Sequence, residues 1–168
     1  YAILAPNPHN RQPWLVDLST EDQVTLYVDT EKLLPHTDPL NRQITVGLGC
    51  FLEVMVMAAT EQGSRVELTL FPQGSDAAGL TKAPVATAKF VQDTSVAPDP
   101  LFAHVMQRRT LKEPFDLTKP VPQSALDAMF ASGQNGTRLA GSVEAKSISE
   151  LRALTGKALQ IEIDTPRT

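Results

Sequence analysis

The sequence has few cysteines, few aromatic residues and no long basic run, and each shortage excludes a class of protein. Its 168 residues include one cysteine, Cys50, which rules out an internal disulfide and a cysteine-based metal cluster. Aromatic residues make up 5% of the chain, too few for a base-stacking platform. The net charge is −4 and the longest cationic run is Arg108-Arg109, which argues against nucleic-acid and membrane-surface partners.

Signatures of several catalytic and binding classes are also missing. The chain has no G-x-S-x-G, no H-E-x-x-H and no glycine-rich phosphate loop, and its three histidines are scattered. We therefore expect neither a serine nucleophile nor a metal. No apolar run reaches the length of a bilayer and no signal-peptide pattern is visible. Both ends look cut, so we expect a fragment, and both a cytoplasmic and a periplasmic location stay open.

The hydrophobic patterning predicts an α+β domain. Alternating residues indicate strands, of which the first two form a hairpin, at 14–18, 23–29, 65–71 and 85–92. Helices are expected at 39–62, 100–109, 122–132 and 147–159, with start signals at Asp38-Pro39, at Asp99-Pro100 and at the capping box Ser147 to Glu150. The helix at 39–62 is apolar nearly all round, as is typical of a buried central helix. The prediction is a mixed or antiparallel sheet flanked by helices.

The most unusual stretch is the ten-residue loop A-P-N-P-H-N-R-Q-P-W at positions 5–14. Its three prolines fix φ and remove N–H donors, which excludes a helix and leaves a stiff loop. Asn7, His9, Asn10, Arg11 and Gln12 offer hydrogen-bonding groups that suit a planar polar ligand. The alternative is a structural connector into the strand at Trp14.

A second constellation follows the helix expected at 100–109. Arg108, Thr110 and Lys112 alternate, so in an extended chain they point the same way and could bind a phosphate. The alternative is that the arginines only complement the end of that helix. In the central helix, Gly47 and Gly49 permit either tight packing or close approach by another backbone or a ligand, and Cys50 reads as a core residue.

Together the two motifs resemble those of FMN-dependent nitroreductases. The loop at 5–14 is similar to their A-P-S-x-x-N-x-Q-P-W loop, and R-x-T-x-K at 108–112 is similar to their R-x-S-x-R/K phosphate motif. The order of the two motifs is that of the Acg-like branch, in which one chain holds two fused nitroreductase-like repeats. By this resemblance, residues 1–98 would be most of repeat one and 99–168 the first part of repeat two.

The resemblance also implies roles for individual residues. Those implied to bind FMN are Pro6, Asn7, Pro8, Asn10, Arg108, Thr110 and Lys112. His9 would lie on the substrate side of the flavin, while Gln12 and Trp14 would brace the loop. The counterpart loop of repeat two, at 131–139, lacks the Gln-Pro-Trp ending, so we expect its site to have decayed.

The resemblance implies a flavin oxidoreductase that passes electrons from NAD(P)H through FMN to a nitroaromatic, a quinone or a similar small-molecule acceptor. The expected partners are this acceptor and the C-terminal half of the same protein, with a homodimer as a further option, and neither nucleic acid nor membrane. Two alternatives stay open: an FMN-storing module with little turnover, and a half-domain without activity of its own.

Overall fold

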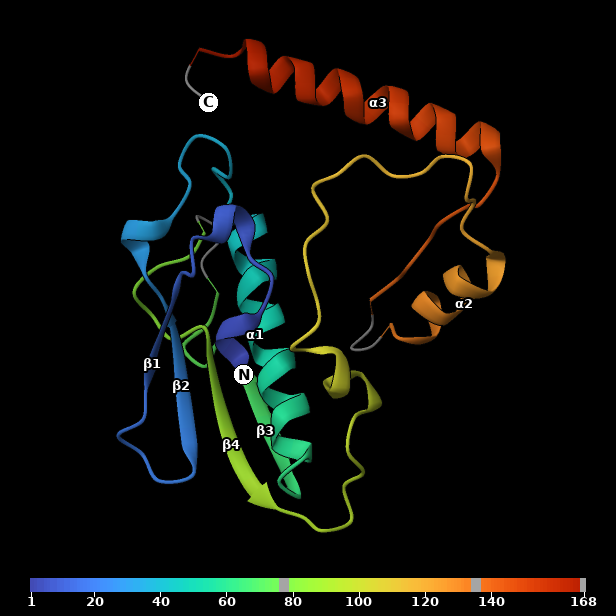
Figure 1. Ribbon diagram of the computed structural model, residues 1–168. Helices are drawn as coiled ribbons and strands as arrows, with labels where there is room; N and C mark the ends of the chain where they lie inside the picture. The colour runs from blue at the N-terminus through green and yellow to red at the C-terminus, as the bar shows by residue number, and fades with distance from the viewer. Residues whose placement is uncertain (76–78, 134–136, 167–168) are drawn as a thin grey trace. The chain divides into compact units, whose positions relative to one another are not determined.

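The computed structural model of the chain describes residues 1–75, 79–133 and 137–166. It divides into two compact units, Tyr1–Thr110 and Leu111–Thr168, and each is described by itself. Figure 1 labels the helices and strands of both units. The site predicted from the sequence involves mainly the first unit.

The first unit is built on an antiparallel sheet of four strands among the described residues. The strands are β1 (Trp14–Asp17), β2 (Gln23–Val28), β3 (Ser64–Leu70) and β4 (Ala86–Gln92), in the spatial order β1-β2-β4-β3. The predicted hairpin is confirmed, since Trp14 pairs with Val28 and Asp17 with Thr25. The four predicted strands agree with the observed strands to within one residue at each end.

The core lies between this sheet and the long central helix α1 (Arg42–Thr60). Leu26 and Val28 of β2 and Ala86 and Ala88 of β4 are buried against it. The residues that α1 contributes to the buried core are Ile44, Leu48, Phe51, Leu52 and Met55. Figure 1 shows α1 running along one face of the sheet. The predicted α+β class, with an antiparallel sheet and a long central helix, is confirmed and is consistent with a nitroreductase-like fold.

The central helix begins later than the sequence predicts. Pro39 is not the first helical residue, because Asn41, with φ 54°, caps the helix and Arg42 opens it. The buried Asp38 still acts as a cap at a distance, since its Oδ2 accepts the N–H of Ile44 at 3.0 Å. At the other end the helix stops at Thr60, and Gly63 takes a left-handed φ of 63° as expected of a terminating glycine.

By length and composition, α1 is the one helix of the described residues that could cross a membrane. This corrects the expectation that no apolar run reaches that length. The core helix of a globular domain meets the same test, so the observation is weak evidence for a membrane span. In the first unit α1 packs against the sheet as a core helix does.

Short 3₁₀ helices complete the first unit: η1 (Ala2–Leu4), η2 (Pro8–Asn10), η3 (Thr30–Lys32) and η4 (Pro100–His104). The prediction of a helix through Arg109 is wrong, because η4 covers only five residues. Its start is as predicted, since Asp99 Oδ1 accepts the N–H of Leu101 at 2.8 Å. Leu101 and Met106 of the expected apolar side remain exposed, so a longer helix would gain little burial.

The second unit contains helices α2 (Gln123–Ala131) and α3 (Ala145–Asp164). The first agrees with the prediction. The predicted capping box is wrong, because α3 begins before Ser147 and is capped at Glu144 without a side-chain bond. Neither helix contains a buried residue.

Candidate functional site

The loop at positions 5–14 has an unusual backbone. The three residues Pro8–Asn10 are assigned to a short 3₁₀ segment, but His9 within it has non-helical φ and ψ, so the loop contains no regular helix, as its prolines predict. His9, Asn10 and Gln12 have positive φ of 49°, 52° and 50°. A left-handed conformation costs a non-glycine residue roughly 1–2 kcal/mol, and less for asparagine. Such strain persists only where the surroundings impose it, and it is concentrated at functional sites.

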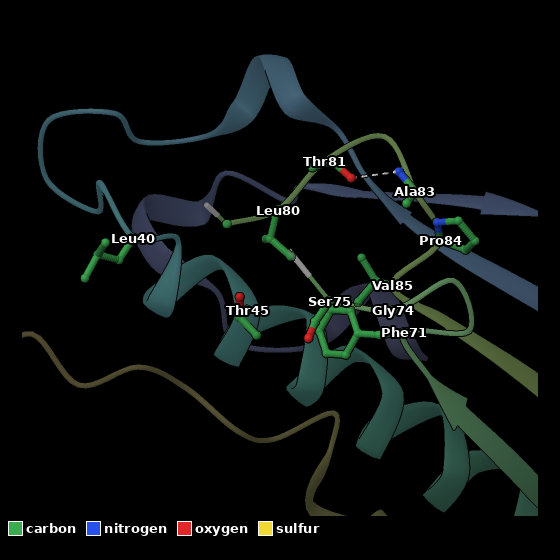
Figure 2. A pocket seen from close by; sticks show the side chains of 11 residues that line it. Leu40, Thr45, Phe71, Gly74, Ser75, Leu80, Thr81, Ala83, Pro84 and Val85 are labelled. Carbon is green, nitrogen blue, oxygen red and sulfur yellow. Dashed lines mark hydrogen bonds between the residues drawn. The ribbon is translucent and has the colours of Figure 1, made fainter. Parts of the chain in front are cut away.

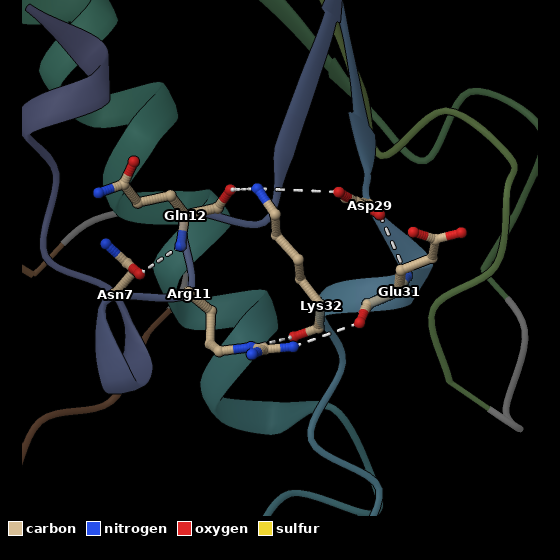
Figure 3. Close-up of polar contacts among 6 residues, drawn as sticks. All are labelled: Asn7, Arg11, Gln12, Asp29, Glu31 and Lys32. Carbon is tan, nitrogen blue, oxygen red and sulfur yellow. Dashed lines mark hydrogen bonds and ion pairs between the residues drawn. The ribbon is translucent and has the colours of Figure 1, made fainter.

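The side chain of Asn7 holds the loop closed from within. Its Oδ1 accepts the backbone N–H of Gln12 at 2.8 Å, and its Nδ2 donates to the carbonyl oxygen of Ala5 at 3.2 Å. Figure 3 shows the bond from Gln12. Asn7 therefore has a bracing role that the sequence did not predict, and its contact with a flavin stays a prediction.

The loop rests directly on the central helix at Gly47. A Cβ built on Gly47 would lie 3.2 Å from Cβ of Asn7 and 3.2 Å from Cδ of Pro8. The glycine therefore permits close approach by another segment of the chain, which was one of the two alternatives for it. Gly49 has no heavy atom within 4 Å of such a Cβ among the described residues, so the two glycines are not equivalent.

The far end of the loop is anchored in the core. Pro13 is fully buried and Trp14 packs on Phe51 of α1 with ring centroids 5.2 Å apart. Gln12 Nε2 donates to Asn10 Oδ1 at 3.2 Å. Trp14 and Gln12 thus brace the loop, as the resemblance implied.

What the loop leaves at the surface is a small set of groups. Pro6, His9, Asn10 and Gln12 are exposed, and Pro8 is half-buried on Gly47. All of these except Gln12 are positions that the resemblance links to a flavin or its substrate. Their roles in binding stay predictions.

Arg108 and Thr110 of the second motif belong to the same unit as the loop, and Arg108 contacts the residue just before the loop. Arg108 Nη2 donates to the carbonyl oxygen of Leu4 at 3.2 Å, and Leu4 directly precedes the loop. Arg108 Nη1 donates to Thr110 Oγ1 at 3.3 Å, so these two side chains lie on the same side, as the alternation predicted. Both are exposed. Lys112 belongs to the second unit and is exposed there, and its part in a phosphate site stays a prediction.

The thiol of Cys50 lies near this motif. Partial burial raises its pKa above the ordinary value, while the charge of Arg108 acts in the opposite direction. Cys50 is half-buried and packs against the core, in agreement with its assignment as a core residue. A raised pKa leaves the thiol protonated near neutral pH, so a nucleophilic role is not indicated.

A separate cavity lies beyond the start of α1 (Figure 2). It has a volume of about 180 Å³ and is lined by residues that include Thr45, Phe71 and Val85. None of the predicted site residues lines it. Pockets for drug-sized ligands usually measure ~300–1,000 Å³, so this cavity does not suit a cofactor.

Other sites can be assessed only for the described residues. Residues 1–75, 79–133 and 137–166 contain no group of three or more metal-ligating side chains. The counterpart loop at 131–139 includes Gln134, Asn135 and Gly136, which lie outside the described residues. The prediction of a decayed second site is therefore untested.

Comparison with known proteins identifies distant relatives. No protein-family model matches the sequence. In Mycobacterium tuberculosis (strain ATCC 25618 / H37Rv), "Uncharacterized protein Rv3127" is 30% identical over 166 residues, covering 89% of this chain and 46% of that protein. "Putative NAD(P)H nitroreductase Rv3131" is 27% identical over 158 residues, covering 94% and 44%. "Putative NAD(P)H nitroreductase acg" is 29% identical over 92 residues, covering 55% and 28%.

The chain spans about half the length, or less, of the curated relatives it matches. The match to Rv3131 nevertheless extends over 94% of this chain. The two relatives named as nitroreductases support a relationship of this chain to the nitroreductase family.

Proposed function

We propose that the chain is part of an FMN-binding oxidoreductase of nitroreductase type. The observation that carries the proposal is the hydrogen bond from Arg108 to the carbonyl oxygen of Leu4, which places Arg108 of the second motif beside the residue that precedes the loop, 104 residues earlier in the chain. FMN has a planar ring system and a phosphate. The stiff polar loop suits the ring, and a cation beside a hydroxyl suits the phosphate. The nitroreductase names of two relatives agree with it.

The donor set fits the two ends of FMN. The phosphate is a dianion, and a guanidinium beside a hydroxyl offers it charge and several N–H donors. In this proposal Arg108, Thr110 and Lys112 hold the phosphate. The isoalloxazine ring is planar with a polar edge, and Pro6, Asn7, Pro8 and Asn10 of the loop would contact it.

When bound, FMN would supply the redox chemistry, taking electrons from NAD(P)H and giving them to a nitroaromatic, a quinone or a similar acceptor. The chain's own residues would bind and orient the cofactor. His9, which is exposed on the loop, would face the acceptor. The C-terminal half of the same protein, or a second copy, would complete the site, and residues 1–98 and 99–168 would belong to two fused repeats.

Flavin binding by the full-length protein tests the proposal. We expect Arg108→Gln to weaken FMN binding by about 10–100-fold, because it removes charge-assisted bonds worth about 1.5–3 kcal/mol. Arg109→Gln is the matched control, since Arg109 donates to the carbonyls of Met106 and Arg108 and occupies a variable position of the motif. Retention of FMN can be measured by fluorescence titration.

A protein that stays colourless with added FMN would refute the proposal. A yellow protein that NAD(P)H fails to bleach without oxygen would support FMN storage in place of turnover. Equal loss of binding in the Arg108 and Arg109 variants would refute the phosphate assignment.

A further inference from the structure

Two cationic side chains connect the loop and η3, and each donates hydrogen bonds to backbone carbonyls of the other segment. Arg11 Nε donates to the carbonyl of Lys32 at 3.0 Å, and Arg11 Nη2 to that of Glu31 at 3.2 Å. In return Lys32 Nζ donates to the carbonyl of Gln12 at 3.1 Å. Figure 3 shows this pair, which we call the Arg11–Lys32 clamp. Neither residue belongs to the motif positions given roles above.

The η3 end of the clamp is fixed to the sheet. Asp29 follows β2, its Oδ1 accepts the N–H of Glu31 at 3.1 Å, and its Oδ2 lies 3.8 Å from Lys32 Nζ. The N–H of Asp29 donates to the carbonyl of Pro13 at 2.7 Å, which continues the β1–β2 pairing. The clamp therefore connects the loop to the β1–β2 hairpin.

The loop end of the clamp acts at the strained residue. Gln12 has φ 50°, and its N–H closes the loop onto Asn7 while its carbonyl is held by Lys32. His9 and Asn10, also left-handed, lie inside the segment thus closed. Without the clamp, Gln12 could return to an ordinary φ and turn its N–H away from Asn7, which would release the exposed groups from their positions.

We propose that Arg11 and Lys32 are positioning residues of the flavin site, an inference that rests on the proposed function. They hold the loop in its strained conformation and act on the ring only through the loop. Backbone carbonyls accept hydrogen bonds from three of their donor atoms, namely Nε and Nη2 of Arg11 and Nζ of Lys32. The two cationic side chains therefore stabilise the conformation of the loop. Their removal should therefore affect recognition of the ring and not of the phosphate.

The test uses the full-length protein with Arg11→Gln and Lys32→Gln, and two probes, FMN and riboflavin, which lacks the phosphate. We expect each variant to weaken both ligands by about tenfold. The same loss is expected at about 1 M salt, where the Debye length of ~3 Å suppresses attraction between exposed charges. Arg65→Gln is the matched control, since it removes one exposed, ion-paired cation of the same unit away from the loop and should leave binding unchanged.

Two further readouts separate positioning from general stability. Lys32→Arg keeps a donor and should restore most of the binding and the visible circular dichroism of the bound flavin. In the ligand-free protein, hydrogen exchange at the Gln12 amide should accelerate in Lys32→Gln, with far-ultraviolet circular dichroism unchanged. Unaltered Gln12 exchange would overturn the inference.

The outcomes distinguish this inference from the proposed function. If the unmodified protein binds neither ligand, both fail. If it binds both and the two glutamine variants bind equally well, only the positioning role fails. A loss confined to FMN, or one that disappears at high salt, would show that the cations attract the phosphate, and that too overturns the inference.

Discussion

At the scale of single residues, the candidate site depends on how each polar group of the loop is used. Asn7 accepts the backbone N–H of Gln12, and the exposed Asn10 accepts a hydrogen bond from the side chain of Gln12, while His9 is exposed on the loop. The sequence offered all of them as ligand-binding groups. The difference matters for mutagenesis. Replacing a residue that braces the loop weakens binding by displacing the loop, whereas replacing a residue that contacts the ligand removes the contact itself.

The two glycines of α1 allow a matched pair of substitutions. In Gly47→Ala the new Cβ would press on Asn7 and Pro8 at 3.2 Å, so we expect loss of about 1 kcal/mol or more of stability and weaker FMN binding through a displaced loop. In Gly49→Ala nothing lies within 4 Å among the described residues, and the gain in helix propensity should stabilise by up to about 1 kcal/mol. Urea denaturation measures both. Equal stabilisation by both substitutions would contradict the loop contact.

At the scale of elements, the start of α1 depends on a carboxylate six residues upstream of the group it binds. Asp38 is 5% exposed and satisfies the N–H of Ile44, while the nominal cap, Asn41, makes no side-chain capping bond. Asn41 Oδ1 instead accepts the N–H of Leu80 at 3.0 Å and so ties the loop after β3 to the helix. The same sequence signal, Asp-Pro, precedes η4, where Asp99 caps a helix of five residues.

Substituting the two capping aspartates tests how much each cap contributes to the free energy of unfolding. We expect Asp38→Ala to cost about 1–3 kcal/mol, because it leaves a buried N–H without a partner at the head of the core helix. Asp99→Ala should cost less than about 1 kcal/mol, since η4 contains no buried residue and its N–H groups can reach water. Chemical denaturation followed by circular dichroism gives both values. A larger cost for Asp99→Ala would contradict the assigned role of Asp38.

At the scale of the whole molecule, the division into two units is the main feature. The first unit has a continuous core of sheet and helix, whereas the helices of the second contain no buried residue. The segment 111–121 between η4 and α2 contains neither helix nor strand and is exposed throughout. The first unit therefore has a core of its own, whereas the helices of the second unit bury no side chain among the described residues.

Limited proteolysis should reflect this organisation. We expect trypsin to cut this chain first after Arg108, Arg109 or Lys112, which are exposed and outside helices and strands. Arg65 and Lys89 lie within paired strands and should resist, so an N-terminal fragment ending near residue 110 should accumulate. Mass spectrometry of the time course identifies the fragments. Early cleavage at Lys89 would contradict the stability assigned to the sheet.

Much of the fold can be read from the sequence because local patterns decide it. Alternating apolar residues locate all four strands of the described residues, and the four polar residues between the first two predict the hairpin. The unbroken apolar pattern of α1 predicts a core helix, and Gly63 predicts its end. The two motifs, at 5–14 and 108–112, are likewise visible without coordinates.

What only the tertiary structure decided is the use of each group, because that depends on partners distant in sequence. The cap of α1 and the length of η4 follow from burial, which periodicity does not report. The contact of Gly47 with Asn7 and Pro8 joins segments 40 residues apart. The loop of positions 5–14 is strained, braced from within and clamped by Lys32, whereas the sequence alone indicated only that it is stiff.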